Sequence, residues 1–560
     1  MNIFWRTGWL LTAMITIAFF LLPLVAIFYQ AGSAESDSVS HLWNTVLFDY
    51  LKNSLLLVLG TVLFALIFAL PCSWIVSTFS FRGQAVLQWV LCLPLAIPPY
   101  LVGYLYTDLL DFAGPVQGVL RSIFGWSSSQ DYWFPQIRTL GGACVVLALV
   151  LYPYIFLLTR IALMEQSESL NHSAKILGVN GWQLIKKVTF PLARPAIAIG
   201  TALVAMETLG DFGTVSYFAV STLTTAVYDT WLGLNDLGTA ARISLLMLFL
   251  IFLLLSVERY SRRKQKVYQR GYERQQGLRP LTGWKLCLAM IYCWGLVAVA
   301  FFIPLAKLLY WSYHYFELSW NDKFWHYAYN SLSVSITAAV VSVILALFLL
   351  FFRRLNQQQP GAGHYLARYG LPLSSLGYAV PGTVLAIGLL IPLTSADHLL
   401  NNLLKSFNLP LVGLFFSGSM FALVAAYIIR FSAMSIGSVE TSLNKISPSL
   451  DMASRTLGYN GLKMLCRVHF PLLSKGVLTA LMMVFLESMK ELNASLLLRP
   501  FNFDTLATHV FTLTSDEQLE QASLSAVFLV LVGLIPVIVL TRSLLSSSNN
   551  SSSNKTERSV

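Results

Sequence analysis

Charged side chains are scarce in this sequence, and their scarcity excludes an ordinary soluble domain. Only 11% of the 560 residues are Asp, Glu, Lys or Arg, whereas soluble domains carry about 25%. Hydrophobic residues make up 56%, and the mean hydropathy is +0.66. The net charge of +11 would suit a nucleic-acid partner, but cytoplasmic loops of membrane proteins collect Lys and Arg in the same way. We therefore expect a lipid membrane as a partner and no nucleic acid.

Catalytic and cofactor motifs are also missing. The sequence has no G-x-x-x-x-G-K-[ST], the usual nucleotide-cradling loop. It has neither H-E-x-x-H nor G-x-S-x-G, and its eight histidines are scattered. None of its six cysteines forms a C-x-x-C pair, so we interpret them as packing residues. These absences predict no catalytic residue, no metal site and no bound cofactor, so the chain is not expected to be an enzyme by itself.

Long apolar runs dominate what is present. A helix needs about 20 apolar residues to cross the hydrocarbon core of a membrane. The sequence therefore predicts an all-α polytopic membrane protein with twelve crossing segments. The first run is long enough for a retained anchor, although small residues at Ala31–Ala34 also allow a cleaved signal peptide. The expected spans are 7–29, 52–77, 85–110, 139–162, 196–220, 240–258, 284–312, 328–352, 366–394, 411–433, 474–497 and 522–542.

The loops indicate both orientation and domain organisation. Lys and Arg gather in one set of loops and Asp and Glu in the other. Positive loops stay in the cytoplasm, which predicts that both termini are cytoplasmic. One long polar segment, 259–283, divides the chain into six-span halves at 1–258 and 284–544. The Ser- and Asn-rich tail 545–560 is expected to be disordered on the cytoplasmic side.

An internal repeat lies in a basic loop after the fourth span of each half. Residues 169–195 and 449–475 align without a gap at a constant offset of 280. Since each half has six spans, the two halves should be parallel repeats with both copies on the same membrane face. The ten identities are Ser169/Ser449, Leu170/Leu450, Leu177/Leu457, Gly178/Gly458, Asn180/Asn460, Gly181/Gly461, Val188/Val468, Phe190/Phe470, Pro191/Pro471 and Leu192/Leu472.

Each copy reads as a helical hairpin. A short helix should end at Gly178 or Gly458, where glycine can take a left-handed cap. Asn-Gly then marks a turn. A second, amphipathic helix should end at Phe-Pro before the next span. An amphipathic helix lying on lipid is the alternative, but duplication at the same topological position favours a docking surface for protein.

The pattern of Gly, nine residues and then V-x-F-P resembles the EAA loop of permeases in binding-protein-dependent ABC importers. In that family the loop is the coupling helix and sits in a groove of the ATPase subunit. The family's Glu-Ala-Ala is replaced here by His172-Ser173-Ala174 and Met452-Ala453-Ser454, so the acidic residue is absent from both copies. The resemblance implies ATPase coupling by Leu177, Gly178, Asn180, Gly181, Val188, Phe190, Pro191, Leu457, Gly458, Asn460, Gly461, Val468, Phe470 and Pro471.

Three further segments resemble the fused, twelve-span ferric iron permeases: Met206–Phe218, Tyr378–Gly388 and Phe485–Thr508. Asn493 stands where that family commonly has Pro. The resemblance implies ferric iron as cargo, a bacterial inner membrane, a periplasmic substrate-binding protein and two copies of a cytoplasmic ATPase subunit that bind the ATP. Thiamine, sulfate and polyamine permeases remain alternatives, as does a secondary transporter driven by an ion gradient.

Four carboxylates fall inside the apolar runs. Glu207 and Asp211 are four residues apart, which places them on one face of the fifth span, and Glu487 and Glu491 match them at the offset of 280. Such groups normally face water or protein, and hard oxygen ligands suit ferric iron. They either line a translocation path or pair with Lys490, Arg499 or backbone.

Prolines interrupt the third run of each half. Such breaks either open a gated cavity or only bend the helix. The residues concerned are Pro94, Pro98, Pro99 and Pro381-Gly382.

Overall fold

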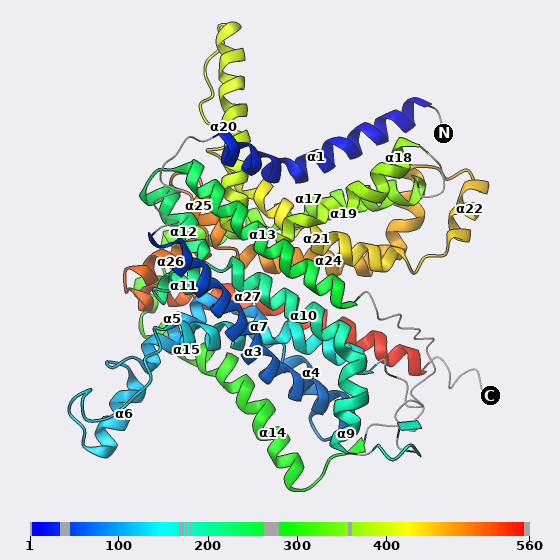
Figure 1. Ribbon diagram of the computed structural model, residues 1–560. Coiled ribbons are helices and arrows are strands. Elements are labelled where there is room, and N and C mark those ends of the chain that lie inside the picture. The colour runs from blue at the N-terminus through cyan, green and yellow to red at the C-terminus, as the bar shows by residue number, and fades with distance from the viewer. Residues whose placement is uncertain are drawn as a thin grey trace. The chain divides into compact units, whose positions relative to one another are not determined.

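The computed structural model describes residues 3–33, 45–164, 166, 173–174, 176–179, 181–262, 279–356 and 361–553, and helices dominate it (Figure 1). Within these ranges, eleven helices are long and apolar enough to cross a membrane. A twelfth crossing segment is a pair of helices bent by 90°, Gln84–Ala96 and Pro99–Phe124. The prediction of an all-α polytopic protein with about twelve spans is confirmed.

One compact unit, here called unit 1, combines Met1–Val39, Val227–Leu245 and Trp320–Thr512. Its core is built by α17, α21 and α24, which pack on one another, and α1 and α20 pack on that group. The helices of unit 1 are α1 (Ile3–Ser33), η3 (Asp229–Gly233), α17 (Asp322–Asn356), α18 (Ala362–Tyr365), η5 (Leu366–Gly370), α19 (Leu371–Ser374), η6 (Ser375–Ala379), α20 (Gly382–Ser406), α21 (Met420–Leu443), α22 (Pro448–Thr456), α23 (Leu462–Met464), η7 (Leu465–His469), α24 (Phe470–Lys490) and α25 (Asn493–Leu498).

Unit 2 combines Ser40–Ala226, Leu246–Ser319 and Leu513–Val560, and its core is α3, α7 and α10. A short parallel pair, β1 (Phe79–Ser80) and β2 (Arg279–Pro280), joins two of its loops. Its helices are α3 (Leu47–Thr78), α4 (Gln84–Val90), η1 (Leu93–Ala96), α5 (Pro99–Leu110), α6 (Pro115–Phe124), α7 (Leu140–Met164), α9 (Trp182–Leu184), η2 (Ile185–Thr189), α10 (Phe190–Gly210), α11 (Gly213–Tyr217), α14 (Trp284–Val297), η4 (Ala298–Phe302), α15 (Ile303–His314), α16 (Phe316–Ser319) and α27 (Leu519–Ser553); α12 (Leu223–Tyr228), α13 (Leu237–Arg262) and α26 (Leu506–Ser515) are shared between the units.

The compact units are not the two sequence halves. The first span, α1, belongs to the unit built mainly from the second half, and α14 and α15 belong to the unit built mainly from the first half. The two six-span halves thus remain a sequence repeat, whereas packing interleaves them. Helix α13 continues to Arg262 inside the expected linker, and α27 continues to Ser553 inside the tail expected to be disordered.

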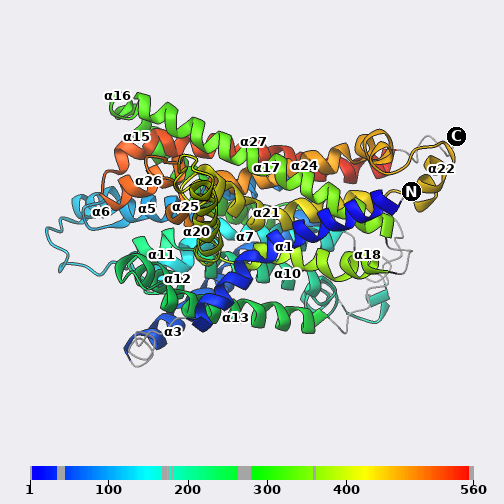
Figure 2. The ribbon, with the colours of Figure 1, turned by 90° about the horizontal axis from the view of Figure 1, so that it is seen from above.

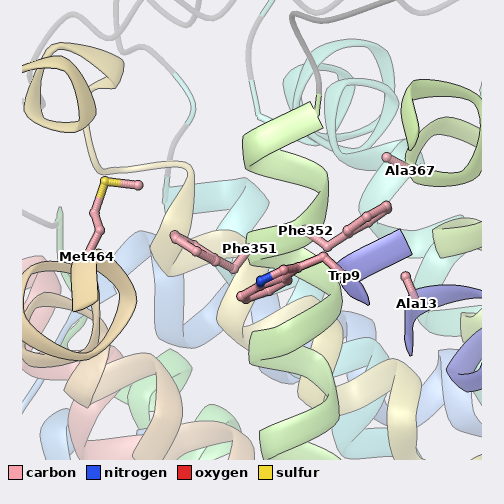
Figure 3. Packing of buried hydrophobic residues seen from close by; sticks show 6 residues of the cluster. All are labelled: Trp9, Ala13, Phe351, Phe352, Ala367 and Met464. Atoms are coloured by element: carbon pink, nitrogen blue, oxygen red, sulfur yellow. The ribbon is translucent and has the colours of Figure 1, made fainter. Parts of the chain in front are cut away.

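The N-terminal part of α1 is packed into a hydrophobic cluster (Figure 3). Trp9 stacks on Phe348 of α17, with ring centroids 5.1 Å apart and planes at 15°. Ala13 of α1 and Met464 of the second repeat copy belong to the same buried cluster. Because Trp9 and Ala13 are buried in it, the first run is a packing element of unit 1.

We expect two native thiols to report this interleaving directly. Cys72 on α3 and Cys293 on α14 are buried, and their sulfur atoms lie 3.7 Å apart. With a protease site inserted between residues 263 and 278, oxidation by copper phenanthroline should hold the two fragments together on a non-reducing gel. The Cys293→Ser variant should release them. Separate fragments from the oxidised parent chain would contradict the packing of α14 on α3.

Candidate functional site

The second repeat copy begins with a capped helix, α22. After its last turn the backbone N–H of Tyr459 donates to the carbonyl of Ser454 at 2.9 Å, and that of Gly458 donates to Arg455 at 3.1 Å. Gly458 has φ 82°, in the left-handed region. This pattern is a Schellman ending, which favours glycine because a Cβ is disfavoured there. The predicted glycine cap of this copy is confirmed.

The first copy has the same geometry wherever it is described. Gly178 has φ 80°, and the N–H of Val179 donates to the carbonyl of Ala174 at 2.9 Å. The next helix of each copy starts at a second left-handed glycine, Gly181 at φ 57° and Gly461 at φ 55°. Residues 167–172, 175 and 180 lie outside the described residues, so Asn180 has no structural account. The repeat seen in the sequence is thus a repeat of backbone conformation.

The expectation that Phe-Pro ends the second helix of each copy is wrong. Helix α9 passes through the π-helical turn η2 into α10, and Trp182–Gly210 is one candidate span. The N–H of Phe190 donates to Ile185, five residues back, and η7 repeats this with Phe470 and Leu465. Pro191 has no N–H to give to a residue four back, and a wider turn absorbs such an interruption without ending the helix. Each hairpin is therefore continuous with a span.

The tips of both hairpins present apolar side chains to the exterior. Leu177 and Leu457 are 81% and 75% exposed. On the opposite side of the second helices, Leu184 and Met464 are buried. A hairpin with an apolar tip and a packed base suits insertion into a groove of another protein.

An ion-pair cluster, formed by Arg354, Asp451 and His469, ties the second hairpin to α17. The Nε of Arg354 donates to Asp451 at 2.6 Å, and its Nη1 donates to the carbonyl of Leu443 at 2.9 Å. His469 Nε2 lies 3.1 Å from Asp451 Oδ1. The guanidinium thereby joins the end of α17 to the end of α21 and to α22. Sequence reasoning missed this cluster, although Asp451 is the only acidic residue in its repeat copy.

The first acidic pair does not share one helix. Glu207 is in α10, but α10 ends at Gly210 and Asp211 has an extended backbone. The carboxylate of Asp211 accepts hydrogen bonds from the N–H groups of Thr214 and Val215, at 3.0 and 3.1 Å. Asp211 thus lies between two helices, after the end of α10, and caps the start of α11. The expectation of two carboxylates on one helical face is corrected.

The second pair lies at the matching break and is held by cations. Glu487 pairs with Lys490 at 3.1 Å. Glu491 follows the last residue of α24, accepts from the N–H of Ala494 at 3.0 Å and pairs with Arg430 of α21 at 3.3 Å. Pairing with Lys490 and with backbone was one of the two alternatives. Arg499, another possible partner in that alternative, pairs with Asp504 instead.

A glycine brings the proline break of the second half against this ion pair. A Cβ on Gly382 would lie 2.4 Å from Arg430 Nη1 and 2.6 Å from Glu491 Oε1. The position therefore has no room for a larger residue. Gly382 thus allows close packing around a buried ion pair at the point where the chain changes direction.

Clusters of metal-ligating side chains are absent from the ranges that the structure describes. These ranges contain no set of three or more His, Cys, Asp and Glu side chains that could hold a metal ion. Four of the six cysteines are buried, and Cys287 and Cys466 are exposed. These residues offer no resident metal centre.

Comparisons with known proteins agree with the geometry. The family model described as "binding-protein-dependent transport system inner membrane component" matches residues 61–267, which include the first hairpin. The Fe(3+)-transport system permease protein FbpB 2 of Haemophilus influenzae is 25% identical over 544 residues, covering 96% of this chain and 98% of that protein.

Two relatives match a shorter stretch. The molybdenum transport system permease protein ModB of Escherichia coli is 31% identical over 176 residues, covering 31% of this chain and 71% of that protein. The sulfate transport system permease protein CysW of Escherichia coli is 28% identical over 219 residues, covering 36% of this chain and 67% of that protein. With its many apolar spans and its duplicated hairpin, this chain belongs to the family of inner-membrane permeases of binding-protein-dependent ABC transport systems.

Proposed function

We propose that this chain is the complete permease of an importer for ferric iron, powered by two copies of a separate ATPase subunit. The observation that carries the proposal is the pair of hairpins with the same backbone geometry and exposed apolar tips. Two equivalent hairpins suit two equivalent partners. Because one chain carries both, no second permease subunit is needed.

The mechanism follows from how the hairpins are attached. ATP is bound and hydrolysed by the partner subunits, and their closure moves both hairpins. Each hairpin passes without a break into α10 or α24, so a movement at the tip is transmitted along a span. Asp211 and Glu491 follow the far ends of these two helices, where the helical backbone is interrupted. Rocking of the two repeats then gives alternating access.

The proposed orientation puts the hairpins and both termini in the cytoplasm. A periplasmic binding protein then delivers the cargo on the opposite face. We propose that Glu207, Asp211, Glu487 and Glu491 lie along the path, with Glu487 and Glu491 held in place by Lys490 and Arg430.

The ferric cargo is supported by coverage. The ferric permease of Haemophilus influenzae matches both halves of this chain, whereas the molybdenum and sulfate permeases match about a third of it. Carboxylate oxygens also suit a hard trivalent cation, which is here the substrate and not a resident cofactor.

Transport assays separate the alternatives. We expect the chain, produced with its ATPase and binding protein in a bacterium lacking its own ferric importers, to restore accumulation of radioactive iron. The same cells should accumulate no radioactive molybdate or sulfate beyond background. Uptake of either oxyanion in place of iron would overturn the cargo. Gradient-driven uptake by liposomes containing this chain alone would overturn the ATPase dependence.

A further inference from the structure

Helix α20 of unit 1 is one of the eleven long apolar helices, but it runs across the direction of α17, α21 and α24. In Figure 1 it stands across α17, α21 and α24, and in Figure 2 it is seen end-on while those helices lie lengthwise. It crosses α1 where a Cβ on Gly388 would lie 2.6 Å from the carbonyl oxygen of Pro23. Pro23 lies about 15 Å inside the outer end of α1, at 1.5 Å per residue. A helix that crosses α1 at Pro23 and runs perpendicular to it therefore lies at a depth that α1 itself passes through.

The outer part of α20 and its return loop, residues 398–419, form an apolar hairpin. Lys405 is the only charged residue in this segment. His398, Asn402 and Lys405 are exposed along one strip of the helix. Large apolar side chains are exposed on another strip of the helix and throughout the loop at 409–415. They include Leu399, Leu403, Phe407, Leu411, Leu414 and Phe415, each at least half exposed.

Backbone groups of the return loop find partners in Asp397, the residue that precedes the hairpin, and in Asn401. The carboxylate of Asp397 accepts from the N–H groups of Phe416 and Ser417, at 2.7 and 2.8 Å. The amide of Asn401 accepts from Val412 at 3.1 Å and donates to the carbonyl of Gly413 at 2.7 Å. Two side chains one helical turn apart thus supply partners to irregular loop backbone. Lipid demands this arrangement, because it offers no hydrogen bonds to a backbone.

The corresponding segment of the first half carries more charge. At the offset of 280 it is 118–139, between the proline break of the third run and the fourth span, and it contains Arg121, Asp131 and Arg138. Hydrogen bonds from the N–H groups of Ser128 and Ser127 hold the pKa of Asp131 below its usual range. The same place in the repeat therefore has two different chemistries.

We propose that residues 398–419 are immersed in lipid, in the membrane leaflet opposite the coupling hairpins, as a lateral anchor of unit 1. Exposure favours lipid over a water-soluble partner for the return loop, because every residue from 409 to 415 is exposed and apolar. The polar strip of the helix, with His398, Asn402 and Lys405, then faces the headgroups. Lys405 can reach the headgroups along its own apolar stem. The anchor fixes the C-terminal end of α20. The N-terminal end of α20, at Gly382, packs on the Arg430–Glu491 pair. The membrane is thereby linked to the break that follows α24.

Spin labels would test this placement in the full chain. The exposed native thiols are first removed as Cys287→Ser and Cys466→Ser. Leu411→Cys and, separately, Phe407→Cys then carry a nitroxide in phospholipid nanodiscs. Ser129→Cys is the matched control in the first half. At 411 and 407 we expect collisions with oxygen to exceed those with a water-soluble nickel complex several-fold, and at 129 the reverse.

Each other outcome overturns the proposal. Free access of the nickel complex at 411 and 407 would place the hairpin in water. Access for neither reagent would mean that protein covers it. Protection from the nickel complex that requires added binding protein would make the segment a docking surface for that protein. None of these results bears on cargo or ATPase coupling, which the uptake assays measure.

Discussion

Replacing Gly458 with valine is expected to reduce ATP-driven uptake at least about tenfold while the protein still inserts into the membrane. Left-handed backbone costs an L-residue about 1–2 kcal/mol, and a β-branched side chain tolerates it worst. Gly458 has φ 82° and no atom within 4 Å of its Cβ position, so the penalty comes from the backbone and not from a clash. Relieving it redirects the chain between α22 and α23 and moves the tip.

The controls isolate this backbone effect. Gly458→Asn should retain most uptake, because asparagine accepts the left-handed cap. Gly437→Val should be nearly neutral, since Gly437 is helical with open space at its Cβ position. Gly178→Val should reproduce the defect in the first hairpin. Normal uptake by Gly458→Val, at a membrane level matched by immunoblot, would sink the role of the cap in coupling.

The Asp451→Asn substitution is expected to uncouple the second hairpin. Charged hydrogen bonds of this kind contribute about 1.5–3 kcal/mol each. Losing one such bond shifts the ratio of hairpins attached to α17 to hairpins detached from it by roughly 10- to 100-fold, at 1.4 kcal/mol per factor of ten. Uptake per ATP hydrolysed should fall by at least about tenfold, because α22 is no longer fixed to α17 and moves in place of α24 when the partner closes. Iron uptake and phosphate release in proteoliposomes containing the ATPase give this ratio.

The first hairpin provides the comparison. Thr189 occupies the place of His469 there and donates only to the carbonyl of Leu184, at 3.4 Å. Thr189→Ala should therefore leave the transport ratio nearly unchanged. Equal effects of Thr189→Ala and Asp451→Asn would show that the ion-pair cluster has no special part in coupling.

Local signals made the hairpins predictable from sequence. Glycines at left-handed positions, a constant offset and long apolar runs each act through the backbone or through nearby residues. The spans, the repeat and the caps at Gly178 and Gly458 could therefore be predicted. The end expected at Pro191 was wrong because a proline signal does not tell a helix end from a π-helical turn.

Long-range pairings could not be predicted in the same way. Arg354 meets Asp451 across 97 residues, and Arg430 meets Glu491 across 61. A charge in an apolar run must find some partner, but the sequence alone does not say which. The helix ends before Asp211 and Glu491 could not be predicted either, since the apolar runs continue past them.

The attachment of α1 to α17 also has a consequence for synthesis. Trp9 stacks on Phe348, so the ribosome must add more than 300 residues before this partner exists. At about 5–20 residues per second, α1 waits roughly 17–70 seconds. During that interval Ala13 and the other residues of its packing face meet lipid or an insertion factor in place of α17. The order in which the chain is synthesised therefore delays the packing of α1 on α17.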